Sequence, residues 1–558
     1  MSGDAELLAL LAEHLVLTAA PAVFAVLLAA RLGLRSLTLL LGVALLASGA
    51  SAMLVFWAFF GFPVLGQTVS FMIVLGSLGG IAWLGFEGGF DRALLRRLAV
   101  PLALWALASV FIAFLGFDHG GIHSSLELAS TRFSQELPTD NAIPRYFADW
   151  FYVHGHDGTP PPFADWLSSD RPPLQIGYTL AQRPFGWDAH DLHYQLIGIV
   201  LQQLWVLGAW AVLCAARLRP LPRALGMIAA LVSDIAIVHG FFVWPKLLAA
   251  AFLLAALAMV LDGDWRRWSR QPWAGALFAG LLALAMLAHG SSVFFAIPLL
   301  GLAALRAMPS WRWLGVALLV GFVLLAPWSA YQRWFDPPGD RLIKWQLGGS
   351  LEIDDRGSLQ TIVDGYREAG LGGALENKWG NVTQLLGAGE VHKAIVQAGD
   401  GDLGNAIIAI RFPRFFSLLP CIGFLLIGPL AMLCRYLFRS RAGPPGGPEW
   451  SFALTALGLL AAACLVWVLL MFGGPGSGTT IHVGSLAVPL LALSACAVGA
   501  YASWRPLGIG LVAFNAAFVL FLYAPELSPP PGSSYSVLAI VLAAAGLLGF
   551  ATVSLRAR

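Results

Sequence analysis

Long apolar segments recur along the whole chain, and short connections containing arginine separate many of them. A bilayer core about 30 Å thick needs roughly 20 apolar residues per helix, and about fifteen segments approach that length. We therefore predict an all-α polytopic membrane protein with about 15 transmembrane helices, within a range of about 13 to 15. The predicted spans lie near residues 6–30, 36–60, 68–88, 98–116, 192–214, 222–243, 245–261, 274–289, 291–305, 312–330, 413–433, 451–472, 481–502, 505–523 and 535–554.

Arginines fall in alternate connections between these spans, as at Arg31, Arg96, Arg219 and Arg267, and at the C-terminus at Arg556. Short loops rich in Lys and Arg face the cytoplasm. The two long polar segments, about 117–190 and 331–410, then face the outside as two long extracytoplasmic loops.

The composition agrees with a membrane protein, because 58% of the residues are hydrophobic and 11% are charged. The net charge is +2 and no long Lys/Arg run occurs, which argues against a nucleic-acid partner. The five cysteines lie in or beside apolar segments and form no C-x-x-C pair, so we expect small buried side chains rather than disulfides or a zinc site.

The first long loop contains LPTDNAIPRYFADWFYVHG, whose large apolar residues recur at helical spacing. We predict an amphipathic helix that lies in the membrane interface, with Asp140 at its N-cap and Pro144 in its first turn. On this pattern alone, Asp140 either caps the helix or takes part in chemistry.

The segment SSDRPPLQIGY follows, at residues 168–178. Arg171 precedes a proline and is therefore expected to be extended, and the Pro-Pro pair would hold Asp170 and Arg171 in a fixed loop at the bilayer surface. A rigid turn with a surface ion pair is the alternative interpretation.

Together these features resemble the bacterial GT-C glycosyltransferases, in the branch related to protein O-mannosyltransferases and lipid A aminoarabinose transferases. The resemblance covers about 60 residues and rests on an ordered set of matches. The matching residues are Asp140, Tyr146, Phe147, Ala148, Gly155, Asp170, Arg171, Pro172, Pro173, Leu174, Phe185 and Gly186.

The resemblance implies an enzyme that transfers a sugar from a polyprenyl-phosphate carrier to an extracytoplasmic acceptor, which is a glycan, a lipid or a protein. With the family's first helix placed at residues 98–116, the chain is expected to contain a catalytic transmembrane core (98–330) that includes the outer loop 117–190, a second outer loop (331–410) and C-terminal spans (411–558). The three spans before this core (1–97) are extra and depart from the family pattern. The bacterial inner membrane, with the active site facing the periplasm, is the expected location.

The chain departs from the family pattern at the acidic pair, which reads Asp140-Asn141 here, and Asp118 directly follows the family's first helix. Sugar transfer needs a base for the acceptor's proton and positive charge for the departing phosphate. Either Asp140 or Asp118 is the candidate base, and Asp170 is expected to position the acceptor or share its proton.

Four cations are candidates for binding the donor phosphate. Arg171 adjoins Asp170, and Lys246 stands at the outer end of a predicted span, where it either binds phosphate or extends to the interface. Arg341 and Lys344 lie in the second outer loop, which either covers the site or is an ordinary solvated loop.

Three further residues are possible site-lining groups. Asp234 falls inside a predicted span, where an ionisable group costs about 2.5 kcal/mol or more and indicates function or polar helix packing. His289 and His482 lie at predicted outer helix ends.

The segment D-H-G-G-I-H at residues 118–123 contains one H-x-x-x-H spacing but is too short a signal alone, and no H-E-x-x-H motif occurs. No metal site or cofactor is therefore predicted, although a divalent metal remains compatible with the loop's His and Asp content. The competing functions are a transporter or flippase of lipid-linked saccharides, a polymerase or ligase that uses a larger lipid-linked donor, and a non-catalytic assembly subunit. Polar residues concentrated in outer loops favour the glycosyltransferase over a transporter with a midplane site.

Overall fold

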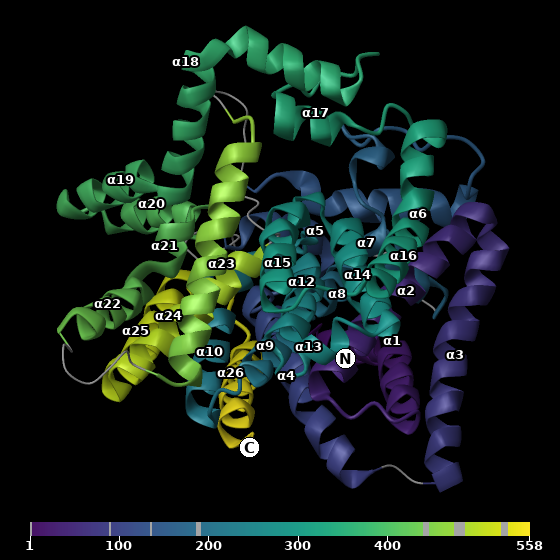
Figure 1. Cartoon of the computed structure of the whole chain (residues 1–558), viewed down its shortest axis with the longest axis horizontal. Helices are drawn as coiled ribbons and strands as arrows, with labels where there is room; N and C mark the ends of the chain where they lie inside the picture. Colours follow the sequence, from purple (N-terminus) through teal and green to yellow (C-terminus); the bar gives the residue numbers. More distant parts are fainter. Residues whose placement is uncertain are drawn as a thin grey trace.

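The computed structural model describes residues 3–88, 91–133, 137–185, 191–438, 446–473, 486–525 and 534–557, most of which are helical (Figure 1). Within these ranges the one extended pairing is an isolated bridge between Phe163 and Trp166. The predicted all-α class is therefore confirmed.

Ten helical segments of the described chain are long and apolar enough to cross a membrane. They are α1 (Gly3–Arg31), α2 (Leu37–Gly61), α3 (Pro63–Gly88), α4 (Arg92–Gly116), α8 (Asp191–Gln202) joined to α9 (Trp205–Ala215), α16 (Trp311–Ala330) joined to η6 (Tyr331–Phe335), α21 (Leu418–Ile422) joined through η7 (Gly423–Leu426) to α22 (Ile427–Phe438), α23 (Pro448–Leu470), α25 (Arg505–Tyr523) and α26 (Val537–Arg556). The protein is thus a multi-pass membrane protein.

The predicted count of about 15 spans is not confirmed. An eleventh span results if α10 (Pro220–Leu231) and α11 (Asp234–Phe242), which are bent by 53°, are taken together. Four other apolar helices have only 14 to 17 residues, because breaks near Pro245 and Gly290 shorten several of them. These are α12 (Lys246–Leu261), α14 (Pro272–Ala288), α15 (Val293–Arg306, preceded by η5, Gly290–Ser292) and α24 (Ala487–Ser503).

Helix α12 is the centre of the bundle and is buried along nearly its whole length. It packs against α9, α14 and α2. Gly208 of α9 permits the close approach, since a Cβ there would lie 2.5 Å from the carbonyl oxygen of Ala251. Small residues at such contacts are typical of helices packed within membranes.

The first long loop is mostly helical and packs onto the bundle. It contains η1 (Ile122–Ser124), α5 (Ser125–Thr131), η2 (Thr139–Ala142), α6 (Ile143–His154), η3 (Ser168–Asp170), α7 (Leu174–Gln182) and η4 (Arg183–Phe185). Helix α6 is the predicted amphipathic helix and buries Ile143, Phe147 and Phe151.

The prediction that Asp140 caps this helix is wrong. Asp140 lies within η2, and the N-cap of α6 is Ala142, which makes no side-chain cap hydrogen bond. The 3-10 turn leaves the carboxylate available for a different partner.

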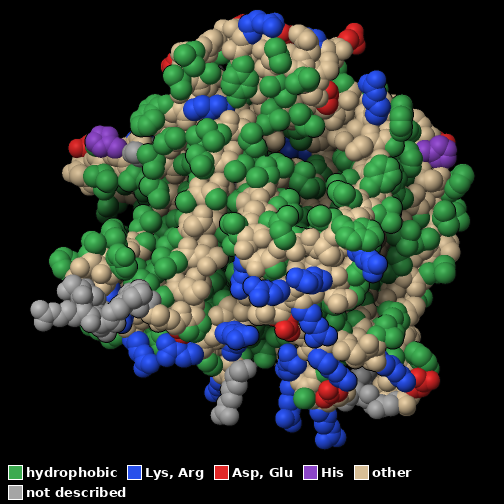
Figure 2. Space-filling view, viewed as in Figure 1, with side chains coloured by type: hydrophobic (Ala, Val, Ile, Leu, Met, Phe, Trp, Pro, Cys, Tyr) green, Lys and Arg blue, Asp and Glu red, His purple; other side chains and the backbone are tan. Residues whose placement is uncertain are grey.

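The second long loop contains α17 (Arg341–Gly348), α18 (Ser358–Leu386), α19 (Ala388–Gly399) and α20 (Leu403–Phe416). Helix α18 bends at Gly370, whose φ of 62° is non-helical, and the bent helix arches with α17 over one end of the bundle (Figure 1). Figure 2 shows Lys and Arg side chains gathered at the opposite end, beyond a broad hydrophobic band.

A short helix, α13 (Trp265–Trp268), lies between α12 and α14 in the chain.

Candidate functional site

Asp170 and Arg171 form the core of the predicted motif and take part in two separate ion pairs. Arg171 is extended, with φ −118° and ψ 121°, as expected before Pro172. Its Nη2 donates to Asp140 Oδ2 at 2.9 Å, whereas Asp170 Oδ2 accepts from Arg341 Nη1 at 2.8 Å. Arg171 thus links two parts of the first loop, and Asp170 links the first loop to the second.

The Asp140–Arg171 pair is mostly buried, with 17% and 15% of the two side chains exposed. The Arg171 guanidinium carbon lies 4.1 Å from the centre of the Trp166 ring, which fixes the plane of the cation. Asn141 holds the η2 turn in place. Its side-chain Nδ2 donates to Leu126 O, and its backbone carbonyl oxygen accepts from the Tyr194 hydroxyl at 2.6 Å. Asp140 is therefore a held carboxylate that faces a cation.

Of the four candidate cations, Lys246 has the surroundings that best suit binding of a phosphate. It is 1% exposed, and its Nζ lies 3.4 Å from the centre of the Trp244 ring. No carboxylate in the described part of the chain is within ion-pair distance of Lys246. The charges of Asp140 and Arg171 act on it from beyond that distance. A buried cation without a close anion is costly unless a ligand supplies the anion.

The backbone before Lys246 is strained. Val243 has φ 55° and ψ 26°, a left-handed conformation that is a genuine outlier for a β-branched residue and costs about 1–3 kcal/mol. Gln175 Nε2 donates to the Val243 carbonyl at 3.0 Å, and Gln202 Oε1 accepts from the amides of Leu247 and Leu248 at 3.1 Å. Side chains of α7 and α8 therefore hold the break that positions Lys246.

Two histidines lie beside Trp244, the ring that Lys246 contacts. The ring centre of His289 lies 6.4 Å from that of Trp244. His239 contacts Phe415 O at 3.4 Å, and its ring centre lies 6.3 Å from that of Trp244. His289 is thus placed beside the site, whereas His482 lies outside the described residues.

Asp170 is held by two donors, since the Leu167 amide also donates to its Oδ2 at 2.9 Å. Its Oδ1 is buried without a hydrogen-bond partner among the described residues. Burial raises the pKa of Asp170 above its usual range, and the Leu167 amide and Arg341 only partly oppose this effect. The residue is suited to hold a proton beside the Asp140–Arg171 pair.

Asp118, the other candidate base, belongs to a different cluster. Its carboxylate accepts from Arg132 at 3.1 and 3.2 Å and contacts His119 Nδ1 at 2.9 Å. Arg132 is 1% exposed and also donates to the Ala524 carbonyl at 2.9 Å. These bonds join α4 and α5 to the end of α25, so Asp118 belongs to an interhelical link that is separate from the Asp140–Arg171 pair.

Asp234 also has a partner of its own. It is the first residue of α11, at the bend after α10, and it forms two hydrogen bonds of 2.7 Å with Arg414 of α20. Both side chains are buried. The structure therefore places Asp234 in a link between helices and not with Asp140.

Replacing Arg414 by alanine is expected to lower the free energy of unfolding by about 3–5 kcal/mol, because it leaves the Asp234 charge buried alone. The measurement is reversible unfolding in detergent. A double variant with Asp234→Leu and Arg414→Met is the control, and it should recover most of the loss. Full stability of the single variant would show that the pair contributes little.

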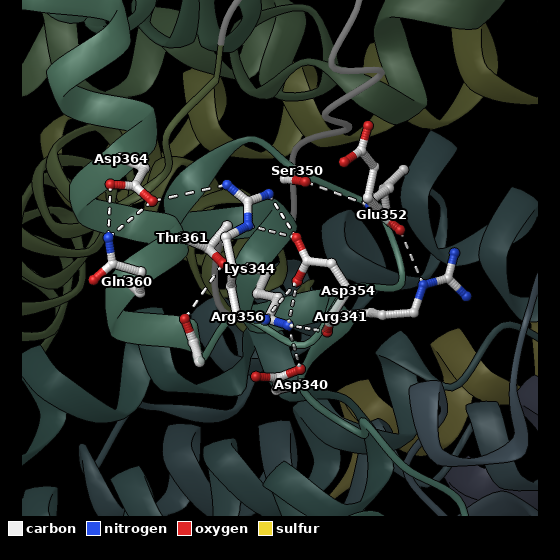
Figure 3. A network of polar contacts seen from close by, with 12 residues as sticks. Asp340, Arg341, Lys344, Ser350, Glu352, Asp354, Arg356, Gln360, Thr361 and Asp364 are labelled. Atoms are coloured by element: carbon white, nitrogen blue, oxygen red, sulfur yellow. Dashed lines mark hydrogen bonds and ion pairs between the residues drawn. The ribbon is translucent and has the colours of Figure 1, made fainter.

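Arg341 and Lys344 lie at the start of the second loop and differ in surroundings (Figure 3). Arg341 donates to Asp170, to Asp165 O at 2.6 Å and to Leu351 O at 3.1 Å. Lys344 pairs with Asp340 at 3.2 Å and with Asp354 at 3.0 Å. Two carboxylates balance the charge of Lys344, so it is a less suitable phosphate ligand than Lys246.

Metal ligation has no geometric support within the described ranges, where no three His, Cys, Asp or Glu side chains gather as a metal site. An apolar cavity of about 270 Å³ between α1, α2, α4 and α9 has no charged side chain in its walls, and Thr18 and Ser48 are the hydroxyl-bearing residues among the side chains that line it. The charged cluster around Asp140 is therefore the better candidate for chemistry.

Sequence reasoning did not identify Trp166, Trp244, His239, Gln175 or Gln202 as parts of this site. The two tryptophans have a local signal, since each lies a few residues before a candidate cation. The glutamines are recognisable only as polar residues in apolar helices, and their partners come from distant segments.

No family model matches the chain, and neither a curated protein nor a solved structure shows significant similarity to it.

Proposed function

We propose that the protein is an integral membrane glycosyltransferase that moves a sugar from a polyprenyl-phosphate carrier to a hydroxyl group of an extracytoplasmic acceptor. The observation that carries the proposal is the Asp140–Arg171 ion pair together with the buried Lys246, which has no close carboxylate in the described part of the chain and whose charge interacts with those of both residues. A base and two phosphate ligands are what this reaction requires.

In the proposed reaction, Asp140 accepts the proton of the acceptor hydroxyl as the oxygen attacks the anomeric carbon. The bond between that carbon and the phosphate oxygen breaks, and the phosphate leaves with the electron pair. Arg171 binds two phosphate oxygens and Lys246 adds a point charge. Asp170, held by Arg341, is available to position the acceptor or to share its proton.

The proposed orientation follows from the distribution of charge. The Lys- and Arg-rich end in Figure 2 faces the cytoplasm by the positive-inside rule, and the end with α17 and α18 then faces outside. Lys246 is the first residue of the buried helix α12, so the phosphate of a carrier would be bound inside the protein at the end of this helix. The resemblance to bacterial enzymes supports the inner membrane, with the site facing the periplasm.

The test is a transfer assay with purified protein in proteoliposomes. Polyprenyl phosphates that carry a radiolabelled hexose or pentose are supplied with extracts of envelope glycans, lipids and proteins as acceptors. We expect label in the acceptor and an equal amount of free polyprenyl phosphate. Movement of intact donor across the bilayer without transfer would identify a flippase and refute the enzyme.

A further inference from the structure

A polar pocket of about 570 Å³ lies between α17, α18 and the end of α23. This volume falls within the range of about 300–1,000 Å³ typical of ligand sites. Its polar walls include Glu352, Arg356, Asp364, Glu368 and Asn377, and Phe472 adds an aromatic surface. None of these residues belongs to the cluster around Asp140.

Backbone geometry forms the pocket. The bend at Gly370 turns α18, so that residues on both sides of the bend line the same space. Gly365 lets α18 touch the end of α17, since a Cβ there would lie 2.4 Å from Gly348 O. Gly349, with φ 79°, leaves room for Phe472, whose ring meets that of Tyr366 edge-on at 5.1 Å.

Several hydrogen-bonding groups of the pocket are available to a ligand. In the described part of the chain, the side chains of Glu352, Glu368 and Asn377 form no hydrogen bond or ion pair, and Asn377 is only 8% exposed. Asp364 is fixed by two hydrogen bonds from Gln360, at 2.8 and 2.9 Å. The pocket thus offers oriented acceptors and an amide.

The charges of the pocket select against an anion. Three carboxylates and one guanidinium, that of Arg356, line the pocket, and Arg356 pairs with Asp354 at 2.6 Å and with Asp364 at 3.8 Å (Figure 3). Arg367, outside the pocket, also pairs with Asp364 at 3.4 Å, so Glu352 and Glu368 are the carboxylates left without a cation among the described residues. The hydroxyl groups of a neutral ligand can donate hydrogen bonds to the carboxylates and accept one from the amide of Asn377. The face of a sugar ring carries C–H groups that pack against an aromatic surface such as Phe472.

The pocket is connected to the proposed reaction site through one side chain. Leu351 lines the pocket, and its carbonyl accepts from Arg341 Nε at 3.1 Å. The same guanidinium donates to Asp170, next to Arg171. One side chain, that of Arg341, therefore links the rim of the pocket to the residue that precedes Arg171.

We propose that this pocket binds a neutral oligosaccharide, the part of a glycan acceptor that lies beyond the reacting sugar. The assignment of this ligand as acceptor rests on the proposed function, whereas saccharide binding itself does not require transfer.

The test measures binding of mannotriose, galactotriose and arabinotriose to the purified protein in nanodiscs, without donor, by saturation-transfer NMR and titration. We expect at least one of these neutral trisaccharides to bind. Glu368→Gln and Asn377→Leu should each weaken binding about 5–10-fold, since the first replaces a charged hydrogen-bond acceptor by a weaker neutral one and the second removes a polar partner. Glu376→Gln, an exposed carboxylate on the same helix that does not line the pocket, should change affinity less than twofold.

Absence of binding for all three trisaccharides, or equal binding by the Glu368→Gln and Glu376→Gln variants, would overturn the proposal. Preference for a uronic-acid trisaccharide over the neutral ones would also overturn it. The Asp140→Asn variant should bind the trisaccharide as the unmodified protein does. Binding that persists in a protein without transfer activity would refute the enzyme and leave the pocket assignment intact.

Discussion

Replacement of Asp140 by asparagine is expected to lower kcat for sugar transfer by about 10²–10⁴-fold, the usual contribution of a general base. Asparagine keeps the size of the side chain but cannot accept the hydroxyl proton. The Arg171 partner remains able to hydrogen-bond the amide oxygen, so the fold should persist. The measurement is initial rate in proteoliposomes, with size exclusion as a check on folding.

Two control variants make this result specific. Asp157→Asn removes an exposed carboxylate from the same loop and should leave the rate unchanged. Asp118→Asn should chiefly reduce stability, because it weakens the buried contact with Arg132. A large loss of kcat in a folded Asp118 variant, together with an active Asp140 variant, would reverse the assignment of the base.

Lys246→Met is expected to weaken binding of polyprenyl monophosphate by at least about 30-fold, which corresponds to about 2 kcal/mol for loss of one partner of a buried charge pair. The variant should also raise the thermal midpoint of the ligand-free protein, because it removes a buried cation that has no close carboxylate. Binding loss combined with added stability separates a ligand-binding lysine from a structural one.

The control for this variant is Lys393→Met, an exposed lysine of α19, which should alter neither quantity. A Lys246→Arg variant should retain part of the affinity, since it keeps the charge. Unchanged affinity in Lys246→Met, or a fall in its thermal midpoint, would show that Lys246 only supports the packing of α12.

The helices could be predicted from the sequence because their signals are local. Runs of apolar residues located the helices, and the spacing from Ile143 to Phe151 identified the amphipathic α6. Hydropathy does not reveal where a run breaks, as the strained Val243 shows. That conformation depends on Gln175, from a segment 68 residues away.

The partners of charged residues could not be predicted in the same way. Asp234 and Arg414 are 180 residues apart, and the sequence around each residue does not indicate that the other is its partner. Arg341 and Lys344 are three positions apart on one short helix, yet one reaches Asp170 and the other pairs with carboxylates of its own loop. Only the tertiary structure shows that carboxylates neutralise the charge of Lys344 and that Lys246 has no close carboxylate within the described ranges.

The most direct measurement is an experimental structure of the protein with bound polyprenyl monophosphate. The phosphate is predicted to lie within hydrogen-bond distance of Lys246 Nζ and the Arg171 guanidinium, with Asp140 on the side open to an acceptor. A phosphate held instead by Lys344, or at the basic end of the molecule far from Asp140, would contradict the proposed site.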